Sequence, residues 1–120
     1  MGVDRMARVA LVAFNGEQIC FVHVLLNALD MKNKGFEVRV VIEGSATKLI
    51  PDLVKVSNPF NGLYNQIKEQ GLIFAVCKAC SSKMNVLEEV MAEGLPIADE
   101  MSGHPSLANY IKEGYQIITF

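Results

Sequence analysis

Apolar residues gather in five short runs, and each of the last four follows a helix-like stretch that ends in glycine. The runs are Arg8 to Phe14, Phe36 to Ile42, Leu72 to Val76, Leu95 to Ala98 and Tyr115 to Phe120. Glycine favours the left-handed conformation found just past a helix end, so each glycine predicts a helix that leads into a strand. The glycines are Gly35, Gly71, Gly94 and Gly114.

Several of these runs are rich in Val and Ile and do not alternate strictly between apolar and polar residues. Strands that helices cover on both faces have this composition. The pattern therefore predicts an α/β fold: a single-domain, three-layer sandwich with a five-stranded, mostly parallel sheet and helices on both faces, in a doubly wound, flavodoxin-like topology.

Polar residues that often cap helices precede stretches with helical spacing of apolar residues. Asn15, Ser45 and Asn58 are the predicted caps of the helices that follow the first two strands. After the third strand, a helix begins either at Asn85 or earlier, near Lys78, and the sequence does not decide between them. The last helix is predicted to begin at Pro105.

The helix after the first strand is unusual because residues 19 to 29 are apolar on nearly every side. Only His23 and Asn27 interrupt the apolar stretch. A helix of this kind must be covered on two sides. In so short a chain the second cover is expected to be another subunit, so we expect a homo-oligomer.

Length and composition favour one domain spanning residues 1–120, with a hydrophobic core large enough to need no disulfide bonds or metal ions for stability. The chain has 120 residues, of which 51% are hydrophobic and 20% charged. The net charge is −2 and the basic residues are scattered, which argues against nucleic acid. The apolar run from Val9 to Phe14 is too short for a secretion signal or membrane span. Three cysteines without such a signal indicate thiols, so we expect a cytoplasmic protein.

Ligands of open α/β sheets bind beyond the carboxyl ends of the strands, and this rule selects the candidate residues. The candidates are Asn15 and Gly16 after the first strand, Glu43, Gly44 and Ser45 after the second, Cys77 and Lys78 after the third, and residues 99–104, including His104, after the fourth. The glycine-rich motifs of dinucleotide and nucleotide triphosphate sites, and the serine hydrolase motif, are missing. We therefore expect no cofactor.

Cys77 is the only strong nucleophile in this set. The helix N-terminus and the neighbouring Lys78 are expected to favour its thiolate, although a cysteine here can also simply close a core strand. Cys80 completes a C-x-x-C pair, which suits redox chemistry or merely packs the first helical turn. His104 either tunes a thiolate or binds an anion, or has a capping role. Glu43 is either a base or an exposed strand end.

Cys20 and His23 share one face of the apolar helix and would complete a four-ligand zinc set with Cys77 and Cys80. Both also fit packing roles inside that helix, which is the more common function of such residues. We therefore expect no metal site.

Three segments match the pattern of one family: "GFEVRVVIEGSA", "IFAVCKACSSK" and "SGHPSLANYIKEGYQIITF". With them the whole chain resembles the DsrE/DsrF/TusD-like superfamily of small sulfur-relay proteins. The resemblance implies a single DsrE-like domain with five strands, assembly into dimers, trimers or hexamers, and a cysteine after the third strand that carries sulfur as a persulfide in active members. Cys77 matches that position, whereas Cys80 is not part of the carrier pattern.

Three hypotheses follow. The first is a persulfide carrier or sulfurtransferase that relays sulfane sulfur through the Cys77 thiolate, with sulfur donor and acceptor proteins as partners. The second is a thiol-disulfide oxidoreductase that uses Cys77 and Cys80. The third is a non-catalytic oligomeric module that binds a small anion or a protein, in which Cys77 is buried and unreactive. Whether the protein is an enzyme stays open at this point.

Overall fold

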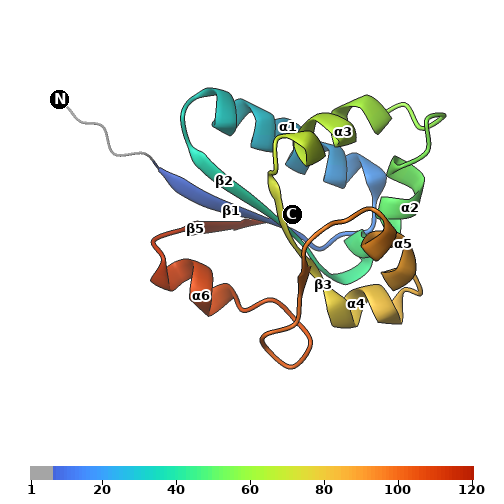
Figure 1. The fold of residues 1–120 in the computed structure, drawn as a ribbon. Coiled ribbons are helices and arrows are strands. Elements are labelled where there is room, and N and C mark those ends of the chain that lie inside the picture. The colour runs from blue at the N-terminus through green and yellow to red at the C-terminus, as the bar shows by residue number, and fades with distance from the viewer. Residues whose placement is uncertain (1–6) are drawn as a thin grey trace.

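A single sheet of five parallel strands forms the centre of the molecule in the computed structural model, which describes residues 7–120 (Figure 1). The strands are β1 (Arg8–Ala13), β2 (Glu37–Ile42), β3 (Ile73–Cys77), β4 (Ile97–Ala98) and β5 (Gln116–Thr119). Their order across the sheet is β4-β3-β2-β1-β5, and every pairing is parallel. The predicted five-stranded parallel sheet is confirmed.

Helices cover both faces of the sheet, which confirms the predicted three layers. They are α1 (Gln18–Asn33), the 3-10 helix η1 (Gly44–Leu49), α2 (Ile50–Leu53), α3 (Asn61–Glu69), α4 (Lys78–Lys83), α5 (Leu87–Ala92) and α6 (Leu107–Lys112). The larger core lies between one face of the sheet and α1, α2, α3 and α5. A smaller core lies beneath α6 on the opposite face (Figure 1).

Two of the three predicted caps, Asn15 and Asn58, bind backbone N–H groups but stand two residues before the N-cap positions of α1 and α3. The third, Ser45, lies inside η1. Asn15 accepts a hydrogen bond from the N–H of Glu17 at 2.7 Å, and Asn58 accepts one from the N–H of Phe60 at 2.8 Å. Both form tight turns that lead the chain into the helix. The prediction that these residues are the N-caps is therefore wrong by a few positions.

The segment after β3 contains both of the helices between which the sequence did not decide. One begins at Lys78, and the second begins at Leu87 after a turn at Asn85. Asn85 has a φ of 59°, a left-handed conformation that Asn tolerates and that interrupts the helical path. Similarly, α6 begins at Leu107, two residues after the predicted start at Pro105.

Helix α1 is covered on one side only. Phe21 and Leu25 are fully buried against the sheet, whereas Ile19 is 70% exposed and Leu26 is 50% exposed. The apolar residues on its outer side therefore face solvent in a single chain. Within residues 7–120, no helix is long and apolar enough to cross a membrane.

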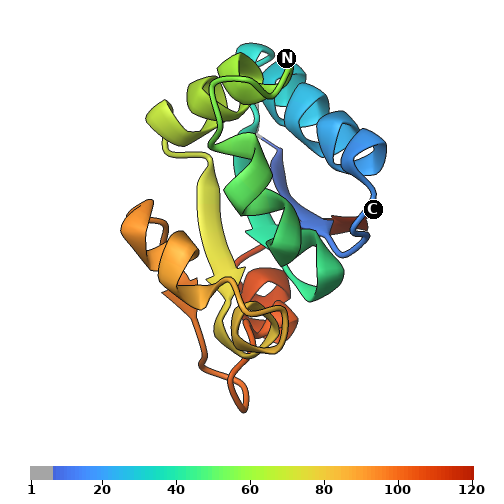
Figure 2. The same ribbon diagram turned by 90° about the vertical axis from the view of Figure 1, so that its right-hand side faces the viewer.

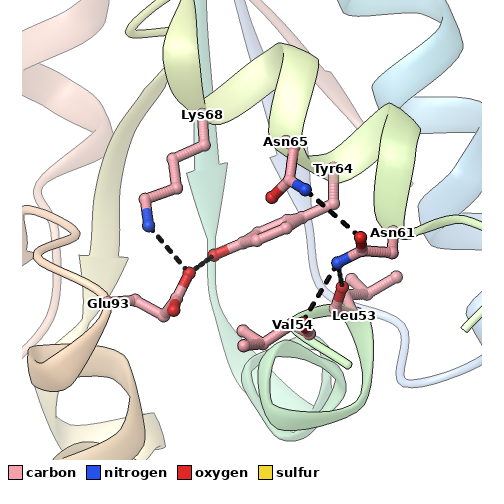
Figure 3. Close-up of polar contacts among 7 residues, drawn as sticks. All are labelled: Leu53, Val54, Asn61, Tyr64, Asn65, Lys68 and Glu93. Atoms are coloured by element: carbon pink, nitrogen blue, oxygen red, sulfur yellow. Dashed lines mark hydrogen bonds and ion pairs between the residues drawn. The ribbon is translucent and has the colours of Figure 1, made fainter. Parts of the chain in front are cut away.

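A partly buried polar network joins α3 to α2 and α5 (Figure 3). The Tyr64 hydroxyl donates to the carboxylate of Glu93 at 2.6 Å, and Lys68 contacts the same carboxylate at 3.0 Å. The Asn61 amide donates to carbonyl oxygens at the end of α2. Burial raises the pKa of Glu93, but hydrogen bonds from Tyr64 and Lys68 outweigh burial and hold that pKa below its usual value. The network therefore links α3 to the ends of α2 and α5.

Candidate functional site

Two thiols and one imidazole meet at the carboxyl end of β3. Cys77 ends the strand, Cys80 lies in the first turn of α4, and His104 comes from the loop between β4 and α6. The Nδ1 atom of His104 lies 3.0 Å from the Cys77 sulfur and 3.8 Å from the Cys80 sulfur. All three donor atoms lie within 4.8 Å of one another. We call these three residues the thiol cluster.

The loop that supplies His104 is attached to α4 by its backbone, and the two lie side by side in Figure 1 and Figure 2. The N–H of Ala79 donates to the carbonyl of Gly103 at 2.8 Å, and Met101 and His104 exchange backbone hydrogen bonds at 2.8 and 2.9 Å. Gly103 has a φ of +91°, and a Cβ there would lie 3.1 Å from the Ala79 Cβ. Only glycine permits this conformation without strain, so Gly103 sets the position of the imidazole.

Cys77 is fully buried, and its sulfur accepts a hydrogen bond from the backbone N–H of Cys80 at 3.4 Å. Burial, and after it a hydrogen bond with Cys80, raises the pKa of the Cys77 thiol to about 12. The expectation that the helix N-terminus and Lys78 favour the thiolate is therefore wrong for the resting thiol. Desolvation dominates, and the Lys78 ammonium lies 3.8 Å from the carboxylate of Asp99 on the exposed surface.

A small cavity of about 260 Å³ opens beside the thiol cluster. Its lining residues are Gly44, Ala79, Cys80, Lys83, Met84 and His104. Cys80 is half-buried and lines this cavity, whereas Cys77 lies behind it. The Lys83 side chain adds a positive charge at the rim. A small sulfur species or a thiol of a partner can therefore approach Cys80 and His104 first.

Glu43 places a buried carboxyl group next to the thiol cluster. It is 5% exposed, and its Oε2 atom has no hydrogen-bond partner among the described residues. Burial raises the pKa of Glu43, and the nearby His104 partly offsets that increase. The same carboxyl group also acts on Cys77 through its charge. The alternative interpretation of Glu43 as an exposed strand end is wrong.

Three other predicted binding residues lie around the ends of β1 and β2 and do not line the cavity. Asn15 binds the backbone as described above, and the Ser45 hydroxyl donates to the carbonyl of Phe14 at 3.3 Å. Gly16 packs so closely on Lys48 that a Cβ there would lie 2.7 Å from its Cε. In this structure these residues shape loops, and their part in ligand binding stays a prediction.

Cys20 and His23 do not join the thiol cluster. Among residues 7–120, the only His, Cys, Asp or Glu group close enough to share an ion is Cys77, Cys80 and His104. The sequence did not single out Lys83 and Met84, which line the cavity, and it included Gly103 only as part of the candidate range 99–104. The glycine directly before His104 was the one available signal, because it marks a turn that positions the histidine.

Comparisons with known proteins agree with this fold. The model of the DsrE/DsrF-like family matches residues 9–120. The uncharacterized protein MJ0733 of Methanocaldococcus jannaschii is 38% identical over 96 residues, which cover 80% of this chain and 76% of that protein. An uncharacterized protein of Archaeoglobus fulgidus is 32% identical over 40 residues, 33% of this chain and 66% of that protein.

Among solved structures, the conserved protein of unknown function BT1422 from Bacteroides thetaiotaomicron has a similar fold. The TM-score is 0.72 at 17% sequence identity, and the match covers 98% of this chain and all of that one. At this identity the likeness concerns the fold alone. Together with the family match along nearly the whole sequence, it leads to one conclusion: the chain belongs to the DsrE/DsrF-like family.

Proposed function

We propose that this protein is a persulfide sulfur carrier, with Cys77 as the residue that holds the sulfane sulfur. One observation supports this most strongly: His104 Nδ1 lies 3.0 Å from the Cys77 sulfur, beside a cavity that a donor can reach. A nucleophile and a base at hydrogen-bonding distance are the parts that covalent thiol catalysis requires. We further propose that residues 1–120 act as a single DsrE-like domain.

His104 compensates for the high pKa of the buried thiol. The imidazole accepts the Cys77 proton as the thiolate attacks, so the free thiolate never has to be abundant. The backbone N–H of Cys80 donates to the same sulfur and stabilises its negative charge. Rotation of the half-buried Cys80 or His104 side chain, both at the cavity, opens the path to Cys77.

In the proposed transfer, the Cys77 sulfur attacks the outer sulfur of a donor persulfide R–S–SH, while the Cys77 proton moves to His104. A new S–S bond forms on Cys77, the donor S–S bond breaks, and R–S⁻ leaves with the proton from His104 as R–SH. The reverse sequence, with an acceptor thiolate as the attacking group, discharges the sulfur. No net oxidation occurs, because the donor supplies the sulfane sulfur.

The proposed partners are a sulfur donor protein, an acceptor protein and further copies of this chain. Exposed Ile19 and Leu26 on the outer side of α1 are the surface that we assign to the copy-to-copy contact. All three cysteines are free thiols, and thiols stay reduced in the cytoplasm, so we propose that location.

Incubation with a sulfane sulfur donor tests the proposal. We expect the intact protein to gain about 32 Da, the mass of one sulfur atom, when Cys77 forms its persulfide. Cys77→Ser abolishes this gain, whereas Cys80→Ser retains it. Cys20→Ser is the matched control, since Cys20 is half-buried in α1 outside the thiol cluster. If Cys80→Ser no longer gains this mass while Cys77→Ser still does, Cys77 is not the residue that carries the sulfur.

A second candidate function is thiol-disulfide exchange. Cys77 and Cys80 form a C-x-x-C pair at the start of a helix, and their sulfurs lie within 4.8 Å. A small rotation of either side chain brings them to bonding distance. A Cys77–Cys80 disulfide with a defined reduction potential, and a protein mass lower by about 2 Da, favours this function over sulfur carriage. A thiol pair that neither oxidises nor takes up sulfur favours the non-catalytic binding module.

A further inference from the structure

We propose that the thiol cluster is also a metal site, in which Cys77, Cys80 and His104 bind one Zn²⁺ ion and leave a fourth position open toward the cavity. This inference does not depend on sulfur carriage. It rests on the donor set, the geometry of its atoms, and the way the surrounding backbone holds them in place.

The donor set suits zinc. Two thiolates and one imidazole are ligands that Zn²⁺ prefers, and a spacing of two residues between cysteines is common in zinc sites. The third donor comes from a loop 24 residues beyond Cys80. The sequence placed His104 at the same edge of the sheet, but only Cys20 and His23 were considered as zinc-binding partners of the two cysteines.

The distances fit a tetrahedral site with small adjustments. Zinc–sulfur bonds of about 2.3 Å and zinc–nitrogen bonds of about 2.0 Å place ligand atoms about 3.5 to 3.8 Å apart. A nitrogen and a sulfur ligand are then about 3.5 Å apart. The His104 Nδ1 atom lies 3.8 Å from the Cys80 sulfur, within about 0.3 Å of this value, and 3.0 Å from the Cys77 sulfur. The second distance must lengthen by about half an ångström, which a small side-chain rotation supplies.

The backbone around the donors is held in place by the protein itself. The hydrogen bond from the Ala79 N–H to the Gly103 carbonyl fixes the His104 loop against the helix that carries Cys80. Buried Glu43, with its unpartnered Oε2, adds a carboxyl group that acts on both His104 and Cys77 through its charge.

The fourth position faces the cavity lined by Gly44, Lys83 and Met84. Three protein ligands and one open position are typical of zinc sites that bind water or an exogenous ligand. The positive charge of Lys83 at the rim favours an anionic occupant, so a thiolate or hydrosulfide is the class of ligand that we assign to the open position.

Cobalt titration of the reduced, metal-free protein tests the site, because Co²⁺ bound by thiolates absorbs strongly and reports tetrahedral geometry. We expect one Co²⁺ per chain, displaced by one equivalent of Zn²⁺. Cys77→Ser, Cys80→Ser and His104→Gln each weaken Co²⁺ binding by at least about 10-fold, since loss of a ligand costs at least as much as loss of an outer-shell partner. Cys20→Ser and His23→Gln are the matched controls and retain full affinity.

A second measurement uses the unaltered chain, so it holds even if a variant folds poorly. We expect Zn²⁺ to slow alkylation of Cys77 and Cys80 by iodoacetamide while Cys20 reacts at its usual rate. Equal protection of Cys20, no thiolate band with Co²⁺, or full binding by Cys77→Ser overturns the zinc site. Sulfur loading is measured with a chelator present, so failure of the zinc site and failure of sulfur carriage give different results.

Discussion

Replacement of His104 by glutamine removes the base from the thiol cluster while keeping a polar side chain of similar reach. The Cys77 thiol has a pKa of about 12, so at pH 7 its thiolate fraction is about 10^(7−12), or one molecule in about 10⁵. The His104 imidazole, 3.0 Å from the Cys77 sulfur, removes the need for free thiolate because it takes the thiol proton during attack. A positioned general base contributes about 10² to 10⁴ in rate. We therefore expect His104→Gln to slow persulfide loading by at least about 100-fold.

The assay follows the gain of one sulfur atom by mass spectrometry after rapid quenching, from pH 7 to pH 9. In His104→Gln the rate should rise about tenfold per pH unit, because loading then depends on the free thiolate of a thiol that titrates far above this range. His23→Gln is the matched control, since His23 is the other histidine of the chain and is exposed on α1. A folded His104→Gln protein that loads within threefold of the unaltered chain refutes the role of His104.

Three further predictions concern stability and assembly. The lowered pKa of Glu93 stabilises the fold above its ordinary value of 4.5, and this contribution is lost as pH falls through the folded pKa. Glu93→Gln should therefore lower the urea midpoint at pH 7, and this difference should shrink as the pH falls below 4.5. The raised pKa of Glu43 means that its ionisation destabilises the fold above pH 4.5. Glu43→Gln should therefore raise the urea midpoint at pH 8, with a difference that vanishes at pH 4. Leu26→Glu should shift sedimentation toward monomer, whereas Val56→Glu, at a site 91% exposed, should not; unchanged sedimentation of Leu26→Glu would place the contact between copies elsewhere.

The strands and layers could be predicted because their signals are local. Glycines with positive φ, such as Gly35 and Gly71, end the helices before β2 and β3, and the apolar runs after them have no other favourable position than the sheet. Helix starts were less predictable. Asn15 and Asn58 bind backbone N–H groups in turns that precede the helix, and a sequence pattern does not distinguish such a turn from a cap.

The candidate site was predictable in part. The strand-end rule placed Cys77 and Glu43 at one edge of the sheet, because Cys77 ends β3, Glu43 follows β2, and β2 and β3 are parallel neighbours. The approach of His104 depends on a backbone hydrogen bond between Ala79 and Gly103, which no local pattern reveals. The thiolate prediction failed for a related reason: depth of burial, which raises the pKa of Cys77, is a property of the packed chain.

The most direct test of the central claim is to locate the added sulfur within the unaltered chain. Trypsin cleaves after Lys78, so Cys77 falls in the peptide of residues 69–78 and Cys80 in the peptide of residues 79–83. The protein is loaded with a sulfane sulfur donor in the presence of a chelator, blocked with an alkylating reagent and digested. We predict an extra mass of about 32 Da, one sulfur atom, on the blocked peptide 69–78. Extra mass on peptide 79–83 alone, or on neither peptide, would contradict the role of Cys77 as the sulfur carrier.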